Sequence, residues 1–588
     1  MRHFILTMRR HAHIIGISLV ILTTIHCVKA DIINRHQCLA RINALNIEGK
    51  TDNHGNPLPP SSSNATAITY DLCVSQCGAG QEPFQWTVFS QQFNAWLLPW
   101  LALVSQLPFG ANDKLDNLES MLLTLGSPTL AAYSLALTVL NGRWVAKLFA
   151  RYRYPNTERA VWILNSLQQS SLRVDTDNAR LASLIILPQN DRWWEKLKSR
   201  LEYEHTWSIS AATSIVWVII AYVFTIIDYF SAGLPTALNA NGQGVGSIGS
   251  LWLWLLPIVV GWLQISPKCD SIRLYKAVVE ANSIAYVATN SAPPILASRI
   301  SNEQAISIEL TATDNARVDE CATPPVYNYA RFLPWRQSVM LVSDAFAIVS
   351  ERNHIHDQII PKVEWRCRNA EDADLMTASH LKDYSKPREG SRLHQLTRRH
   401  GLDASALSRM LIASGVALTL QWGTTGAAAM IVWFTPTIGL GCRSATYILY
   451  GVLSTVVWFM LVTSSILTHY STNCPAQLFG GDFVLALRAR VARLLAIFLR
   501  RSGKVIATIN AVWIVATGMI QFSSFYDRCY CNSSVFGLGI RAYDVITLLP
   551  SDIAGMRAAW IGGFVLAGGA TLLFAGFVTL LIDPLLPP

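Results

Sequence analysis

The sequence predicts an all-α polytopic membrane protein with about seven transmembrane helices and a small, disulfide-bearing N-terminal ectodomain. Composition is the first reason. Of the 588 residues, 51% are hydrophobic and only 14% are charged, which leaves too little polar surface to cover several water-soluble cores. The second reason is a set of long apolar stretches. The third is that basic residues are concentrated in alternate connecting segments, as expected if these segments remain in the cytosol.

Seven apolar stretches approach the length of about 20 residues that a helix needs to cross a hydrocarbon layer of about 30 Å. An eighth stretch, Asn94–Phe109, is shorter and contains Pro99, Pro108 and Gln106. The seven are Met121–Leu140, Ile209–Phe230, Ile248–Ile265, Leu411–Phe434, Ala445–Leu467, Val505–Phe522 and Ala558–Ile582.

The basic connectors decide how the eighth stretch is interpreted. The segment after Leu140 opens with four basic residues and no acid, whereas Ser231–Ser250 carries no charge; the four are Arg143, Lys147, Arg151 and Arg153. If Asn94–Phe109 and Met121–Leu140 both crossed from an outer ectodomain, every strongly basic loop would lie outside, against the positive-inside rule. We therefore predict that residues 94–120 are re-entrant or interfacial. The alternative makes Asn94–Phe109 a span and the N-terminal region cytosolic.

The N-terminus has the pattern of a secretory signal, residues 1–30. Its basic region (Arg2, Arg9, Arg10) precedes an apolar core, Ile14–Cys27, and the small-residue pattern Val28-Lys29-Ala30. An uncleaved anchor is the alternative. Either reading sends residues 31–93 across the membrane as an ectodomain, so we expect a protein of the secretory pathway, with the plasma membrane as its destination.

Cysteines and glycosylation sequons support this orientation. Both sequons, at Asn64 and Asn532, lie on the predicted outer side and are candidate glycosylation sites. Six cysteines also face this oxidising side and are candidates for disulfide bonds. They are Cys38, Cys73, Cys77, Cys442, Cys529 and Cys531.

Three regions are predicted to lie in the cytosol. Residues 141–205, between the first two of the three spans in 121–265, show helical periodicity. The largest loop, 266–409, is predicted to contain helices near Ile272–Val287 and Phe332–Val349 and a disordered stretch, Glu351–Arg399. The last four spans occupy 410–588. Between them, Phe483–Arg501 suits either a helix in the inner leaflet or an extension of the following span.

No motif indicates a catalytic, cofactor-binding or metal site. Gly244-x-Gly246-x-x-Gly249 matches the dinucleotide fingerprint by letter but has no preceding strand. His354, His356 and Asp357 offer ligand atoms in a segment without predicted structure. The formal net charge of +9 sits beside apolar spans, so it indicates contact with anionic lipid rather than nucleic acid.

Glycines mark one predicted packing face. Gly562, Gly569 and Gly576 recur every seven residues in the last span and share one helix face. Glycine allows another helix to approach closely. We predict packing within the chain, with dimerisation as the alternative; the sequence does not determine the oligomeric state.

The first half of the chain resembles a large group of uncharacterised multi-pass membrane proteins of filamentous fungi. The resemblance implies a membrane protein without an established activity, so it transfers no site residues. It rests on Ser105–Gly110, Leu125–Pro128, Leu187–Trp194, His205–Ser208 and Gly261–Asp270.

These observations favour a surface sensor or scaffold, embedded in the lipid bilayer and with cytosolic protein partners bound through 266–409. A channel or facilitator for neutral or weakly polar solutes is the alternative, since few ionisable groups lie within the spans. A membrane-embedded enzyme is the third hypothesis.

Overall fold

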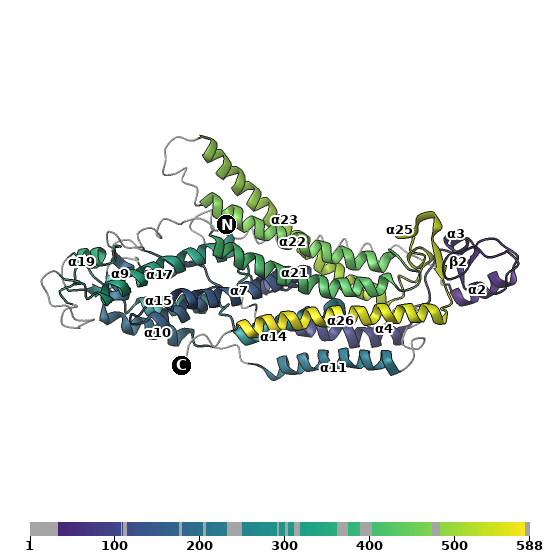
Figure 1. The fold of residues 1–588 in the computed structure, drawn as a ribbon, viewed down its shortest axis with the longest axis horizontal. Coiled ribbons are helices and arrows are strands. Elements are labelled where there is room, and N and C mark those ends of the chain that lie inside the picture. The colour runs from purple at the N-terminus through teal and green to yellow at the C-terminus, as the bar shows by residue number, and fades with distance from the viewer. Residues whose placement is uncertain are drawn as a thin grey trace.

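The computed structural model describes residues 33–107, 109, 114–175, 179–203, 207–231, 250–290, 293–299, 304–310, 318–360, 374–387, 403–472 and 483–582. The molecule is elongated: a small cap lies at one end, long helices fill the middle, and a second helical region lies at the other end (Figure 1). About 70% of it is helical, so the prediction of a helical fold is correct. The predicted signal and the Gly244–Gly249 motif lie outside the described residues.

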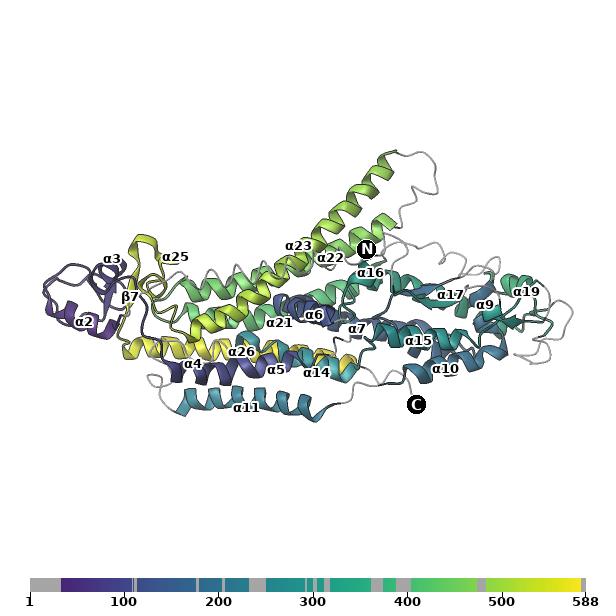
Figure 2. The same cartoon turned by 180° about the vertical axis from the view of Figure 1, so that it is seen from behind.

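Four described helices are long and apolar enough to cross a membrane. They correspond to the last four predicted spans. The segment Phe483–Arg501 is not a separate helix but the first half of one that projects away from the bundle (Figure 2). The four are α21 (Ala404–Trp433), α22 (Cys442–Thr472), α23 (Phe483–Phe522) and α26 (Pro550–Leu581).

The predicted span Met121–Leu140 is wrong as a single straight helix. It is divided between α6 (Lys114–Gly126) and α7 (Pro128–Phe149), and the chain bends there by 105°. Ser127 separates the two helices, and its Oγ accepts a hydrogen bond from Leu130 N at 3.3 Å, which caps α7. Pro128 follows at the first position of α7, where its missing N–H costs nothing. Cap and proline together begin a new helix in a new direction.

The stretch Asn94–Phe109 does not loop back. The helical segments α4 (Trp86–Gln92), η2 (Phe93–Leu97) and α5 (Leu98–Val104) follow one another with helical backbone angles at each junction. They run alongside the other apolar helices (Figures 1 and 2). At their end, Gln106 Nε2 lies 3.4 Å from a hydroxyl of the next apolar helix, Ser210 Oγ. The segment predicted to be re-entrant or interfacial is therefore helical without a sharp bend as far as Val104, and its position relative to the membrane stays a prediction.

Two further apolar helices match predicted spans but are not among the four long ones. They are α11 (Ile209–Ser231) and α14 (Leu255–Ile265), the latter preceded by a turn from Ser250. Both pack against α5, and α14 also packs against α7 and α26.

The cap combines the N-terminal segment with the last connector of the chain. Its three-stranded antiparallel sheet has the order β1-β2-β7, in which Ile68 pairs with Lys50 on one side and Asp544 on the other. The described part of the predicted ectodomain 31–93 therefore shares its sheet with the last connector. The elements are α2 (Arg35–Ala44), β1 (Lys50–Thr51), β2 (Ala67–Thr69), α3 (Tyr70–Leu72), η1 (Cys73–Cys77), α24 (Cys529–Asn532), α25 (Val535–Leu538), η7 (Gly539–Arg541) and β7 (Tyr543–Val545).

At the opposite end, described parts of 150–203 and 266–387 fold together; we call this unit the distal domain. Strand β3 pairs with β6, and Trp193 Nε1 donates to Asn282 Oδ1 at 2.9 Å across the two connectors. Its elements are α8 (Thr157–Ser166), β3 (Leu172–Val174), α9 (Arg180–Ile186), η4 (Pro188–Asn190), α10 (Asp191–Leu201), α15 (Ser271–Asn282), β4 (Tyr286–Val287), β5 (Ile295–Leu296), η5 (Ala297–Arg299), β6 (Ile306–Ile308), α16 (Val318–Ala322), α17 (Phe332–His354) and α19 (Ala378–Tyr384).

The predicted disordered stretch Glu351–Arg399 is partly ordered. It contains the end of α17 and all of α19, in which Leu381 and Tyr384 are buried. Residues 361–373 and 388–399 lie outside the described part of the chain.

The predicted glycine packing face is wrong for packing within the chain. A Cβ at Gly569 or Gly576 would meet nothing within 4 Å, and one at Gly562 would lie 3.5 Å from Met430. The buried face of α26 instead carries Gly563, whose added Cβ would lie 2.7 Å from Ile431. The closest approach between α26 and α21 depends on a glycine of α21: a Cβ at Gly423 would collide with Ala570 Cβ.

We therefore expect Gly423→Ala to lower the stability of the bundle. The new methyl group would push α21 and α26 apart, and such overpacking costs about 1–3 kcal/mol. Gly426→Ala is the matched control, because a Cβ there meets nothing within 4 Å. The thermal unfolding midpoint of each purified variant in detergent measures the difference. Equal midpoints for the two variants, or a loss at Gly569→Leu as large as at Gly423→Ala, would contradict this packing.

Candidate functional site

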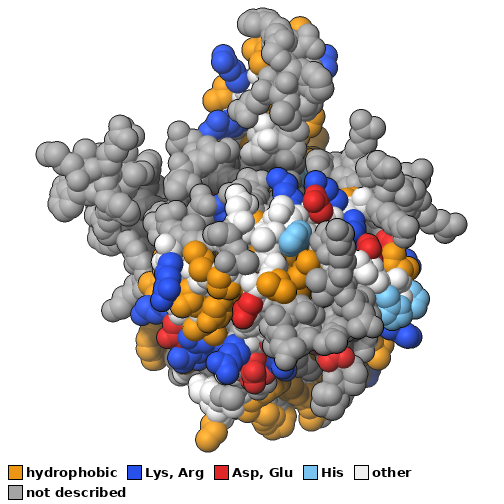
Figure 3. Space-filling model, turned by 90° about the vertical axis from the view of Figure 1, so that its left-hand side faces the viewer, with side chains coloured by type: hydrophobic (Ala, Val, Ile, Leu, Met, Phe, Trp, Pro, Cys, Tyr) orange, Lys and Arg blue, Asp and Glu red, His pale blue; other side chains and the backbone are white. Residues whose placement is uncertain are grey.

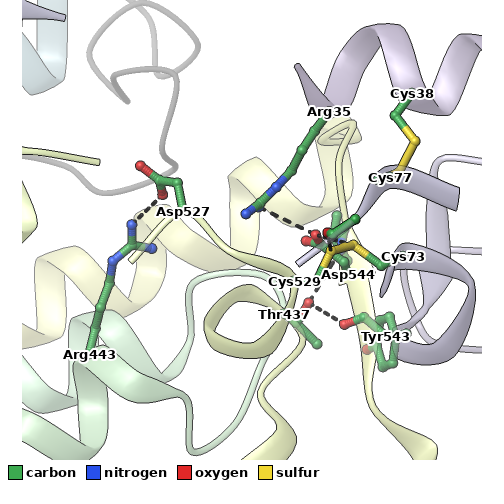
Figure 4. Close-up of polar contacts among 12 residues, drawn as sticks. Arg35, Cys38, Cys73, Cys77, Thr437, Arg443, Asp527, Cys529, Tyr543 and Asp544 are labelled. Carbon is green, nitrogen blue, oxygen red and sulfur yellow. Dashed lines mark hydrogen bonds and ion pairs between the residues drawn. A yellow bond between two sulfur atoms is a disulfide. The ribbon is translucent and has the colours of Figure 1, made fainter. Parts of the chain in front are cut away.

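Three disulfides hold the cap together and join it to the bundle. Cys38 pairs with Cys77 and Cys73 with Cys529 (Figure 4), and Cys442 pairs with Cys531. Among the described residues, the cysteines that pair are therefore the six predicted to face the oxidising side. The bond Cys73–Cys529 spans 456 residues and attaches the N-terminal segment to the connector before α26. The bond Cys442–Cys531 fixes the first residue of α22 to the same connector.

Two buried ion pairs lie beside these disulfides. Arg35 Nη1 is 3.3 Å from Asp544 Oδ2, and Arg443 Nη2 is 2.5 Å from Asp527 Oδ1 (Figure 4). Both carboxylates are only 1% exposed. Burial raises the pKa of the Asp544 and Asp527 carboxyls, and the two guanidinium groups oppose that shift. One indication of these pairs is visible in the sequence, because Arg443 is the only charge in the predicted connector 435–444.

The cap does not provide a metal site among the described residues. Cys73, Cys529 and Asp544 bring ligand atoms close together, but the two sulfurs are bonded to each other and cannot act as thiolate ligands. Among the residues that the structure describes, His354, His356 and Asp357 do not bring their ligand atoms together as a metal site either. Asp357 is paired with Arg352 at 3.0 Å, at the end of α17.

The two sequons differ in their surroundings. Asn64 is exposed on the cap. Asn532 is half-buried, and in the amide orientation that satisfies its neighbours its Nδ2 donates to Tyr526 O at 3.1 Å while its Oδ1 accepts from Arg35. Glycosylation of Asn64 stays a prediction, and the contacts of Asn532 weigh against modification of the folded chain.

In the middle of the molecule, side chains of α22 and α23 hold the break between α6 and α7. Asn510 Nδ2 donates to Gly126 O at 2.8 Å, and Tyr450 Oη donates to Leu125 O at 2.8 Å. The Ser127 hydroxyl donates to Ser454 O at 2.8 Å. A backbone carbonyl left without a donor in an apolar bundle costs several kcal/mol, so these bonds make the break possible. A Cβ at Gly126 would collide with the Ala507 carbonyl oxygen.

The other polar residues predicted within spans are hydrogen-bonded as well. Gln421 Nε2 donates to Thr425 Oγ1 at 2.7 Å, and Gln521 Oε1 accepts from Tyr447 Oη at 2.6 Å. Gln421 Oε1 also accepts from Ser454 Oγ of α22 at 3.5 Å. Together with Asn510, both glutamines therefore act as hydrogen-bond partners between helices. The side chain of Asp228 lies outside the described residues.

A basic cleft lies where α7 leaves the bundle and enters the distal domain. It has a volume of about 800 Å³ and is lined by one face of α7, the turn after it and the start of α8. Its cations include Arg143 and Lys147, four residues apart on α7. Figure 3, which views the distal domain end-on, shows groups of Lys and Arg side chains beside apolar ones. The lining is Arg143, Ala146, Lys147, Phe149, Ala150, Tyr152, Arg153, Tyr154, Asn156, Thr157, Glu158, Arg159 and Val161.

The sequence identified part of this cleft for another reason. The basic residues Arg143, Lys147 and Arg153 predict a cytosolic connector, whereas no sequence pattern distinguishes Arg159 or the aromatic residues of the lining. The available signal was the four-residue spacing of two basic residues, which places both on one helix face.

The buried pair Arg35–Asp544 is expected to be essential to the cap. Asp544→Ala would leave the Arg35 guanidinium buried without its carboxylate, which typically costs about 3–5 kcal/mol. Asp71→Ala is the control, because Asp71 is exposed on the same cap, and surface changes usually stay within about 0.5 kcal/mol. Thermal unfolding and surface abundance of the two variants provide the measurement. An Asp544→Ala chain as stable as Asp71→Ala would show that the pair is dispensable.

Comparison with protein-family models, with curated proteins and with solved structures found no significant match.

Proposed function

We propose that this chain is a multi-pass membrane sensor in which the cap faces outside and the distal domain faces the cytosol. One observation supports this most directly. Helix α7 begins at a break that α22 and α23 hold, and it ends in the basic cleft of the distal domain. The outer end of α22 is bonded to the cap through Cys442. A shift of the cap therefore has a continuous mechanical route to the cytosolic cleft.

The proposed membrane topology has seven crossings and one re-entrant pair. The crossings are residues 86–106, α11, residues 250–265 and the four long helices, while α6 and α7 enter from the cytosolic side and return to it. Ser454, which contacts the break, lies twelve residues after the start of α22, or about 18 Å along the helix. This depth is near the middle of a hydrocarbon layer of about 30 Å.

In this topology residues 86–106 cross the membrane and the pair α6 and α7 is re-entrant. Each connector after α7 therefore stays on the side of the membrane that the sequence predicts. The disulfide-bonded cap then lies in an oxidising compartment, and the basic connectors lie in the cytosol. This arrangement suits the plasma membrane, with Asn64 glycosylated.

A facilitator for neutral or weakly polar solutes is the second candidate. The observation in its favour is the helix break itself, because discontinuous helices near the midplane form the binding sites of many transporters. Flux of glycerol or urea into proteoliposomes distinguishes the two proposals. Wild-type flux above that of empty liposomes, abolished by Asn510→Leu, would favour the facilitator.

Thiol labelling tests the topology. In a background in which the cysteines outside the three disulfides are replaced by serine, Ser105→Cys should react with a membrane-impermeant maleimide only after the plasma membrane is permeabilised. Thr87→Cys, at the other end of the same helical segment, should react on intact cells. Both side chains are exposed. Labelling of Ser105→Cys on intact cells would place residues 86–106 on one side and overturn the crossing.

Hydrogen–deuterium exchange tests the coupling. Replacing Cys442 and Cys531 by serine removes a bond that typically contributes about 2–4 kcal/mol, so amides at the outer end of α22 should exchange faster. If the chain is a sensor, amides of α8 and of the last turns of α7 should change their exchange as well. Ile540→Ala, at a fully exposed position of the cap, is the control and should change neither region. A loosened cap with an unchanged distal domain would contradict the sensor proposal.

A further inference from the structure

The basic cleft contains more positive charge than its own acids can balance. Four cations line it, with Glu158 as the one carboxylate of the lining. Within the described part of the chain, the side chains of Arg143, Lys147 and Arg153 form no ion pair. Like charges that converge on one cavity repel each other, so an anion of high charge would relieve that repulsion.

The fourth cation is held in position. Asn156, whose φ of 66° places it in the left-handed region, precedes α8 and accepts a hydrogen bond from Arg159 Nη1 at 2.7 Å through its Oδ1. The Nδ2 of the same amide donates to Asp191 Oδ1 at 2.6 Å. The guanidinium is thus fixed by a residue that is itself fixed, as expected for a binding group rather than for a solvated charge.

The first turn of α8 adds backbone donors to the same cleft. This helix has ten residues, no side chain caps it, and Thr157 and Glu158 at its start line the cavity. The amides of an uncapped helix N-terminus carry a partial positive charge and bind phosphate oxygens well. Thr157 N already donates to Tyr154 O at 3.3 Å, so Glu158 and Arg159 provide the first-turn amides. Cations and backbone donors therefore converge from two elements.

The position of the cleft along the bundle axis suits a ligand at the membrane surface. Arg409 of α21 donates to Asn141 Oδ1 at 2.6 Å, and its guanidinium lies 4.0 Å from the Trp144 ring. In the proposed topology this contact marks the inner boundary of the bundle, because Arg409 lies 24 residues, about 36 Å of helix, before the outer end of α21. Arg143 begins the cleft half a turn further on.

We propose that this cleft binds a multiply phosphorylated anion, either the headgroup of a phosphoinositide in the inner leaflet or a soluble polyphosphate of the cytosol. The cations supply charge-assisted hydrogen bonds, the amides of α8 complete the phosphate contacts, and Phe149 and Tyr154 form the apolar wall. The inference rests on the proposed function only for the side of the membrane on which the cleft lies. Occupancy of the cleft would then be the state that the cap influences.

The experiment measures binding of two probes to the purified full chain in detergent. One probe is a short-chain phosphatidylinositol bisphosphate and the other is inositol hexakisphosphate. The double variant Arg143→Gln/Lys147→Gln should weaken binding about tenfold or more, because two charge-assisted contacts are lost. Arg151→Gln is the matched control: Arg151 is an exposed neighbour outside the lining, and its loss should change binding less than twofold. Unchanged unfolding midpoints show that both variants are folded.

The outcomes distinguish a lipid headgroup from a soluble anion, and they distinguish failure of the binding proposal from failure of the sensor proposal. Tighter binding of the lipid probe identifies the membrane as the source, and equal or tighter binding of the soluble probe identifies a cytosolic polyphosphate; both support the proposal. Failure of both probes to bind, or equal weakening by Arg151→Gln, overturns it, since the latter would reflect general basic charge. Binding in detergent depends neither on the orientation of the chain in a membrane nor on coupling between the cap and the distal domain. The binding experiment can therefore fail while the hydrogen–deuterium exchange experiment succeeds, or succeed while it fails.

Discussion

The 105° bend of the chain between α6 and α7 is the constraint on which the rest of the structure depends. A helix that ends inside an apolar bundle leaves carbonyl groups without donors, and water is not there to supply them. Asn510 and Tyr450 provide those donors, while Ser127 caps the helix that follows. The requirement extends to packing, because Gly126 lies so close to Ala507 that no side chain fits between them. One polar residue on α23 and one on α22 thus fix where both helices stand relative to α7.

The sequence predicted the helical class and the four long helices because hydropathy and charge act over whole segments. It did not predict which of two neighbouring apolar segments bends. Pro99 made residues 94–109 look interrupted, but a π-helical turn, Phe93–Leu97, precedes it, and such a turn shifts the hydrogen bonding that proline would otherwise break. The signal for the true break was present in Ser127-Pro128, a helix cap followed by a first-turn proline. A hydropathy average over about 20 residues does not detect a helix break that two residues encode.

The glycine face failed for a related reason. Seven-residue spacing identifies residues that share a helix face, but it does not say what that face meets. The buried positions of α26 alternate by three and four residues through Gly563, Ala567, Ala570 and Phe574, and the necessary small residue at the closest point belongs to the partner helix, Gly423. The distal domain shows the same limit at longer range. Pairing of β3 with β6 joins strands of three residues each, too short to be recognised without their partner.

Basic residues have two separable roles at the end of α7, and geometry distinguishes them. To hold a connector in the cytosol, an arginine needs only its charge, so its side chain can point anywhere into solvent. Arg151 meets that description. Arg159 does not, because Asn156 holds its guanidinium toward a cavity that α7 lines with two further cations. Fixing a charged side chain costs conformational entropy. A mobile arginine would orient the connector in the membrane equally well, so membrane topology alone does not explain why Arg159 is fixed. The ordered part of the basic segment is therefore better explained by recognition of an anion than by topology alone.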